Sequence, residues 1–257
     1  MNLVVEGIKY QLYAKKRHGI HSPFVYHLSD HGLSQKMSPS DQHIMQLFAE
    51  KQRKDKRILS IKDLGAGSKK LTNTRSVQNI YRYNSSGKKY GELLWKLVKH
   101  LKPESILELG TSIGNGTLAM HLAAPSAKII TMEGCPSIAQ IAQENFSEFS
   151  EKNTNIELQT GAFHNLIPTL RWKTIDLIFI DGHHNGKALQ DYIELLYARM
   201  GENTMIIIDD IRWSSDMHQA WSAICSDPRF HLSIDFFRMG MIAKRSFQAK
   251  EHFILKH

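Results

Sequence analysis

Residues 107–117 read LELGTSIGNGT, a short apolar strand with an acidic residue near its end that runs directly into a glycine-containing turn. A second stretch, DLGAGSKK at 63–70, has the same local pattern. Many cofactor sites begin with such a turn, because glycine lets the backbone approach a ligand closely. One domain needs one such turn, so the residues that follow each stretch decide between them.

Only the first stretch is followed by the elements that a nucleoside site requires. After Glu108 the pattern predicts a helix, a second strand, and an acidic residue, Glu133, at the end of that strand. An acid in that position accepts hydrogen bonds from two ribose hydroxyls. After Asp63 only polar residues follow at the same interval. We therefore assign the cofactor turn to 107–117.

The glycine spacing and the first acid narrow the class of cofactor. Gly110, Gly114 and Gly116 are spaced GxxxGxG, which is neither the phosphate-binding P-loop nor the dinucleotide fingerprint. Glu108 stands two residues before Gly110, where its carboxylate would repel a pyrophosphate and attract the cationic methionine end of S-adenosylmethionine. These residues favour S-adenosylmethionine over a nicotinamide.

From residue 105 onward, apolar strands alternate with amphipathic helices, which predicts an α/β, doubly wound, mostly parallel sheet with helices on both faces. The predicted strands cover 105–109, 127–132, 155–159, 175–180 and 204–208, and two more cover FHLSIDFF and MGMIAKR. The predicted helices between them cover 117–124, 137–150 and 187–200, and a further helix covers 91–101.

Carboxylates also follow the fourth and fifth strands. FIDGHH places Asp181 after one strand, and IIIDDIRW places Asp209 and Asp210 after the next. The carboxyl ends of neighbouring parallel strands meet at one edge of the sheet, where α/β proteins bind ligands. Three clustered carboxylates repel one another unless a cation or protons compensate, and Mg2+ prefers oxygen ligands. We expect a divalent cation here; the alternative is that Asp209 and Asp210 only cap the following loop.

LELGTSIGNGT, ITMEG and GAFHNLIPTL together resemble the class I S-adenosylmethionine-dependent methyltransferases, and within them the catechol, caffeoyl-CoA and macrolide-sugar O-methyltransferase branch. The resemblance runs in order from about Ser85 to Trp213. It implies a seven-stranded sheet in the order 3-2-1-4-5-7-6, with strand 7 antiparallel. It also implies a cofactor set of Glu108, Gly110, Ser112, Gly114, Gly116, Glu133, Ala162, Phe163, Asp181 and His183. In that set Glu108 and Gly110 line the methionine side, Glu133 holds the ribose, and Ala162-Phe163 cover the adenine.

The same resemblance implies a metal-assisted reaction on a small hydroxylated acceptor. The metal ligands would be Asp181, Asp209 and Asp210, and His184 falls where the macrolide-sugar type has its catalytic base. Catechol-type enzymes have Asp-Asn where this chain has Asp209-Asp210, which adds negative charge here. Asp181 is thus expected to act in catalysis, and Trp213 is expected either to pack or to wall the acceptor.

Residues 1–86 are expected to form an N-terminal helical and loop cap, and residues 87–257 the methyltransferase domain. Within the cap, RHGIHSPFVYHL at 17–28 holds three histidines without a nearby acidic or cysteine partner, so surface or lid residues are favoured over a metal site. The turn at 63–70 belongs to the same segment and is expected to be a tight turn. In the alternative, Ser68 and Lys69 touch the acceptor.

Composition limits the remaining function classes. The 257 residues carry a formal charge of +8, which suits an anionic partner, but the basic residues are scattered and nucleic acid is not favoured. No apolar run approaches the length of a membrane span, and the opening residues MNLVVEGIKYQ are not expected to act as a secretory signal. Two distant cysteines suit a reducing cytoplasm. A homo-oligomer remains open.

Two alternatives to O-methylation follow from the same features. The positive charge suggests an N-methyltransferase acting on RNA or protein, but the NPPY-type tetrad for planar nitrogens is absent from the strand ends. The other alternative is a non-catalytic S-adenosylmethionine-binding protein of the same fold. Such a protein need not keep Glu108, Glu133 and the three carboxylates together.

Overall fold

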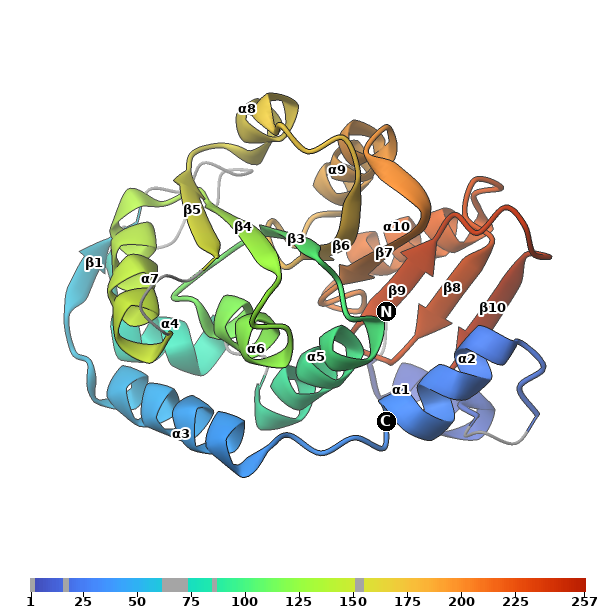
Figure 1. Ribbon diagram of the computed structural model, residues 1–257, viewed down its shortest axis with the longest axis horizontal. Helices are drawn as coiled ribbons and strands as arrows, with labels where there is room; N and C mark the ends of the chain where they lie inside the picture. Colours follow the sequence, from blue (N-terminus) through green and yellow to red (C-terminus); the bar gives the residue numbers. More distant parts are fainter. Residues whose placement is uncertain (1–2, 16–18, 62–73, 85–86, 151–154) are drawn as a thin grey trace. The chain divides into compact units, whose positions relative to one another are not determined.

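The computed structural model describes residues 3–15, 19–61, 74–84, 87–150 and 155–257 (Figure 1). The turn predicted at 63–70 lies outside the described residues, as do Arg17 and His18 of the histidine-rich segment. The chain forms two compact units. The first unit comprises Met1–Ser34, Ser105–Leu107 and Ile167–His257, and the second comprises Gln35–Glu104 and Glu108–Leu166.

The large sheet has the predicted strand order, extended by one strand. Its order is β10-β8-β9-β7-β6-β3-β4-β5. Taken from the other end, β5-β4-β3-β6-β7-β9-β8 corresponds to the predicted order 3-2-1-4-5-7-6, and β10 is the additional strand. β9 runs antiparallel to β7 and β8, which confirms the antiparallel seventh strand. The strands are β3 (Ser105–Leu109), β4 (Lys128–Glu133), β5 (Ile156–Thr160), β6 (Ile175–Ile180), β7 (Met200–Ile208), β8 (Leu232–Asp235), β9 (Gly240–Ala243) and β10 (Glu251–Ile254).

Each predicted helix has an observed counterpart, but the helix predicted over 187–200 ends at Tyr197, because Met200 already begins β7. They are α1 (Leu3–Tyr13), α2 (Pro23–His27), α3 (Pro39–Lys54), α4 (Val77–Asn84), α5 (Gly87–Leu101), α6 (Asn115–Ala123), α7 (Pro136–Phe149), α8 (Phe163–Leu166), α9 (Gly186–Tyr197) and α10 (Ser215–Ser226). Single turns of π-helix and 3-10 helix cover Leu28–Gly32 and Ile167–Thr169. A small antiparallel hairpin pairs β1 (Ile58–Ser60) with β2 (Thr74–Ser76).

The second unit builds its core from the predicted cap helices as well as from the cofactor-turn region. A buried cluster joins Phe48 of α3 and Ile80 of α4 to Leu118 of α6 and Ile138 of α7. α3 begins where Pro39 provides the fixed φ of a first helical residue and Ser38 accepts a hydrogen bond from the Asp41 amide at 3.1 Å. Residues 35–84 are therefore packed into the same unit as the turn after β3.

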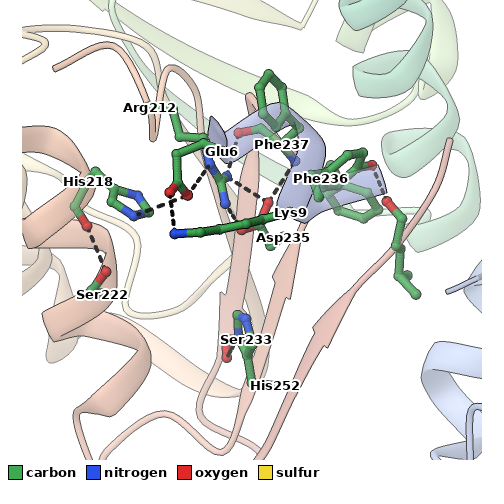
Figure 2. A network of polar contacts seen from close by, with 12 residues as sticks. Glu6, Lys9, Arg212, His218, Ser222, Ser233, Asp235, Phe236, Phe237 and His252 are labelled. Atoms are coloured by element: carbon green, nitrogen blue, oxygen red, sulfur yellow. Dashed lines mark hydrogen bonds and ion pairs between the residues drawn. The ribbon is translucent and has the colours of Figure 1, made fainter. Parts of the chain in front are cut away.

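The first unit packs α1 against the loops beside β8 and β9. Glu6 of α1 forms an ion pair with Lys9 at 2.9 Å and lies 3.9 Å from both Arg212 Nε and His218 Nε2 (Figure 2). The Tyr10 hydroxyl donates a hydrogen bond to the Leu255 carbonyl, and its ring centroid lies 5.3 Å from that of Phe237. Polar contacts thus hold α1 in place. Because α1 buries only Tyr10, its sequence has no apolar periodicity from which a helix could be predicted.

None of the helices in the described ranges is long and apolar enough to cross a membrane.

Candidate cofactor and metal sites

The turn after β3 has backbone conformations that favour glycine. Gly110 and Gly114 have φ values of +102° and +94°, and Ser112 between them has +49°. A side chain on Gly114 would bring its Cβ within 2.6 Å of the Phe146 ring, so only glycine fits at that position. The amides of Gly110 and Thr111 donate to the Met132 carbonyl at 2.9 and 3.1 Å. The turn is therefore fixed against the end of β4.

Glu133 connects that turn to the start of α7. Its carboxylate accepts hydrogen bonds from the Ser112 amide at 2.8 Å and the Cys135 amide at 2.9 Å. Burial raises the pKa of Glu133 although these amides favour the charged form. The Ser112 hydroxyl is buried and has no hydrogen-bond partner within the described parts of the chain. An orphaned hydroxyl beside a fixed carboxylate suits a ligand rich in hydroxyl groups, such as a nucleoside.

Glu108 is the most deeply buried acid of the second unit, with 1% of its surface exposed. It accepts hydrogen bonds from the hydroxyls of Thr117 on α6 and Thr131 on β4, the latter at 2.5 Å. Burial nevertheless raises the pKa of Glu108 to about 7. A cation placed nearby would stabilise the ionised form, which fits a sulfonium ligand. Sequence reasoning missed both threonines, although a hydroxyl inside a buried strand such as ITME was the available signal.

The remaining predicted cofactor residues of the second unit lie at two helix starts. Gly116 is in the first turn of α6, directly after Asn115. Ala162 precedes α8, and its carbonyl accepts hydrogen bonds from the amides of Asn165 and Leu166, while Phe163 is buried. A cavity of about 760 Å3, bounded by α3, α4 and α5, reaches Asn115. None of the predicted cofactor residues lines this cavity, which in the described part of the chain meets the cofactor turn only at Asn115.

In the first unit, three side chains from two strand ends converge. Ligand atoms of Asp181, His184 and Asp210 all lie within 4.8 Å of one another, and this group is the candidate metal cluster among the described residues. His184 Nδ1 lies 3.5 Å from an Asp210 carboxylate oxygen. Burial lowers the pKa of His184, which keeps the ring neutral and able to accept a proton.

Asp210 has a left-handed backbone, with φ at +54°. Aspartate and asparagine tolerate this conformation better than most residues. Burial raises the pKa of Asp210 to about 6, and the charge of Asp209 adds to the effect. A cation in contact with this carboxylate would stabilise its charged form.

Asp209 is directed toward an arginine that sequence reasoning did not anticipate. Arg238, in the turn between β8 and β9, donates from Nε and Nη2 to the two Asp209 carboxylate oxygens at 3.0 and 3.2 Å. The same Nε lies 2.9 Å from Asp210 Oδ1. Three carboxylates and one guanidinium leave a formal charge of −2 (three negative charges, one positive), which a divalent cation balances. The donor set therefore fits Mg2+ or a similar ion.

His183 and Trp213 flank this group in different ways. His183, with φ at +50°, contacts the Tyr192 hydroxyl through Nδ1 at 2.5 Å, and burial raises the pKa of Tyr192 to about 12. Trp213 is 63% exposed, and its ring centroid lies 5.5 Å from that of His184. Because its surface remains so exposed, Trp213 is better placed to wall a bound molecule than to fill a core.

In the densest basic run, residues 51–57, two of the five basic side chains form ion pairs with acids of the described ranges. Lys51 pairs with Glu148, and Arg57 pairs with Asp55 and Glu144, both at 2.7 Å. A nucleic-acid surface requires basic side chains that are available to phosphates. These ion pairs do not favour such a surface here.

Comparison with known proteins agrees with this geometry. A family model described as a methyltransferase domain matches residues 107–211. Catechol O-methyltransferase from Sus scrofa is 31% identical over 133 residues, which are 49% of this chain and 69% of the pig enzyme. The Niastella koreensis catechol O-methyltransferase is 28% identical over 125 residues, 47% of this chain and 55% of that enzyme. The chain spans about half the length of several curated relatives, including 47% of the Bos taurus enzyme.

Solved structures show the same fold at lower identity. The O-methyltransferase from Bacillus cereus in complex with SAH (S-adenosylhomocysteine) has a TM-score of 0.56 and 20% identity, over 85% of this chain and 96% of that one. An SAH-bound methyltransferase of Podospora anserina has a TM-score of 0.59 and 17% identity, over 88% and 97%. The chain belongs to the class I S-adenosylmethionine-dependent O-methyltransferases, the family that includes the catechol O-methyltransferases.

Proposed function

We propose that this O-methyltransferase transfers the methyl group of S-adenosylmethionine to a hydroxyl of a small acceptor with the help of a divalent cation. The observation that carries this proposal is the convergence of Asp181, His184 and Asp210, in a chain of this family. Relatives named catechol O-methyltransferase support a hydroxylated acceptor. The paired state of Lys51 and Arg57 supports a small molecule rather than a nucleic acid.

Each predicted cofactor residue has a physical role in this proposal. Glu133 accepts hydrogen bonds from the ribose hydroxyls, since its carboxylate keeps lone pairs beyond those used by the Ser112 and Cys135 amides. Glu108 stabilises the positive end of the methyl donor by charge. Ala162 and Phe163 cover the adenine, and Gly110, Gly114 and Gly116 leave room for the backbone to approach. Asp181 and His183 complete the predicted set.

The first unit contributes the chemistry of the acceptor. Asp181, Asp209 and Asp210 would hold the cation, which when bound lowers the pKa of a coordinated hydroxyl and orients it. His184 takes the hydroxyl proton at the ring nitrogen that does not face Asp210. The pKa of His184 is lowered by burial, so the neutral base is present at physiological pH. Trp213 limits the acceptor on the side of His184.

The reducing cytoplasm is the compartment that we propose for this reaction. Neither Cys135 nor Cys225 forms a disulfide, and burial raises the pKa of Cys225 to about 12. Inert thiols of this kind suit a reducing compartment.

The metal and the acceptor atom can be tested in one assay. We expect 3,4-dihydroxybenzoate to be methylated on oxygen with Mg2+, and the rate to fall at least about tenfold in EDTA and to recover when Mg2+ is restored. Product from radiolabelled S-adenosylmethionine would be measured by chromatography. 4-Aminobenzoate is the matched nitrogen acceptor. Full activity in EDTA would refute the metal role, and methylation of the amine alone would refute the oxygen acceptor.

A further inference from the structure

The short turn between β8 and β9 directs a cation at the carboxylates that follow β7. Arg238 contacts both Asp209 oxygens at 3.0 and 3.2 Å and lies 2.9 Å from Asp210 Oδ1. The Asp209 side chain has no exposed surface, whereas that of Arg238 is 27% exposed. The two acids gain a positive charge that comes from the protein itself.

A second arginine fixes this turn from the opposite direction. Arg212, two residues after Asp210, donates to both Asp235 carboxylate oxygens at 2.9 and 2.6 Å and to the Phe237 carbonyl at 2.7 Å (Figure 2). The loop that follows β7 therefore contacts the β8–β9 turn through the side chain of Arg212. The turn contacts the acids of that loop through the side chain of Arg238. The two contacts form a reciprocal pair.

Backbone contacts support the same arrangement. The Ile211 amide donates to the Arg238 carbonyl at 2.9 Å, and the Phe237 amide donates to Asp235 at 2.7 Å. Phe237 holds a left-handed φ of +74°, a conformation that a bulky residue adopts only when its surroundings impose it. The backbone of Arg238 is thus held by Ile211, the residue that follows Asp210. This contact fixes the position from which the guanidinium reaches the two acids.

A metal held by the predicted set of Asp181, Asp209 and Asp210 would bind two carboxylates that this guanidinium already contacts. Arg238 Nε lies within hydrogen-bond distance of one oxygen on Asp209 and one on Asp210, the two adjacent residues of the predicted metal set. Two cations that share ligands repel each other, and repulsion is strong where burial keeps water away. Each cation therefore weakens the binding of the other.

We propose that Arg238 is a resident counter-ion that competes with the divalent cation for Asp209 and Asp210, so that the protein binds its metal weakly and reversibly. The inference rests on the metal site of the proposed function. A different role for the same residue predicts the opposite sign: if Arg238 only positions Asp209 as a ligand, removing it weakens metal binding.

Whether removing Arg238 strengthens or weakens metal binding is measured with Mn2+, which replaces Mg2+ because it prefers similar ligands. We expect Arg238→Gln to bind Mn2+ at least about tenfold more tightly than the unaltered chain in isothermal titration calorimetry. Arg238→Lys keeps the positive charge and should remain within about threefold. The matched control is Arg245→Gln, which removes an equal charge from an arginine that contacts Phe24, Phe247 and Gln248. Equal or weaker Mn2+ binding by Arg238→Gln would overturn the proposal.

A measurement on the unaltered protein covers the case in which Arg238→Gln does not fold. The Arg238 Nε–H resonance, identified by its loss in Arg238→Lys, should shift and lose protection from exchange as Mg2+ saturates the protein. An unchanged resonance at saturation refutes the competition but leaves the proposed function intact. If neither the unaltered chain nor the variants bind Mn2+, the metal part of the proposed function fails together with this inference.

Discussion

Replacing Glu108 with glutamine should stabilise the cofactor-free protein by about 3 kcal/mol at pH 8. Burial raises the pKa of Glu108 from 4.5 to about 7, so above pH 7 the folded protein holds a buried charge at a cost of about 1.4 kcal/mol per pKa unit. Glutamine has the same shape and can still accept hydrogen bonds from Thr117 and Thr131. It removes the charge while keeping the packing.

The pH dependence follows from the direction of that shift. Between about pH 4.5 and 7 the folded chain keeps a proton on Glu108 that the unfolded chain has released. Stability contributed by this proton is complete below pH 4.5, falls as pH rises through the folded pKa, and is lost above it. Glu108→Gln should flatten the fall. The same variant should bind S-adenosylmethionine more weakly, because the donor then meets no negative charge at this position.

Urea unfolding at pH 5, 6, 7 and 8 would measure both effects, with cofactor affinity from calorimetry. The exposed Glu157 on β5 supplies the control, since Glu157→Gln removes a carboxylate from the same unit without unburying a charge. An unchanged pH slope in Glu108→Gln would show that Glu108 is not the titrating group. Unchanged cofactor affinity would separate Glu108 from the methyl donor.

Asp210 should separate two substitutions that remove the same charge. Asp210→Ala is expected to weaken Mn2+ binding about 100-fold or more, because the ligand oxygen is lost and alanine is strained at φ +54°. Asp210→Asn keeps an oxygen ligand and a residue that tolerates this backbone. Its affinity should stay within about tenfold of that of the unaltered chain.

Mn2+ electron paramagnetic resonance would count free and bound ion for both variants, and methyl transfer would be followed in parallel. The Asn variant also reproduces the Asp-Asn pair of the catechol-type enzymes that the sequence resembles. If alanine and asparagine bind Mn2+ as the unaltered chain does, Asp210 is not a metal ligand. Equal losses in both would mean that the charge, and not the oxygen, matters.

The strand order could be predicted from the sequence because strands buried on both faces leave continuous apolar runs. IDLIFI and TMIII are such runs, and both became central strands. β10 was missed because EHFI buries only one side chain and depends on pairing with β8. α1 was missed because ion pairs and a tyrosine hydroxyl hold it, and such contacts leave no periodic signal. α10 does carry a periodic signal, since its buried residues Met217, Ala220, Trp221 and Ile224 follow helical spacing, and that signal was not used.

The residues of the candidate site could be predicted only where acidic side chains lie at the ends of strands. Glu108 and Glu133 lie at the carboxyl ends of β3 and β4, and Asp181 and Asp210 follow β6 and β7, so topology brings all four to the carboxyl edge of the sheet. Thr117, Thr131 and Arg238 could not be inferred in the same way. Thr131 had a signal in the buried strand ITME, but Thr117 lies on α6 and its contact with Glu108 depends on how that helix packs. Arg238 reaches Asp209 across 29 positions of chain by the folding of the β8–β9 turn.

Calorimetric titration of the protein with S-adenosylhomocysteine, before and after Glu133→Ala, tests whether the turn after β3 and Glu133 bind the cofactor. We expect one binding site in the unaltered chain and an affinity about 100-fold lower in the variant, since two charge-assisted hydrogen bonds to the ribose are lost. The exposed-residue variant Glu157→Gln should bind as the unaltered chain does. Absence of binding to the unaltered protein at millimolar ligand, or equal binding by Glu133→Ala, would refute this cofactor site.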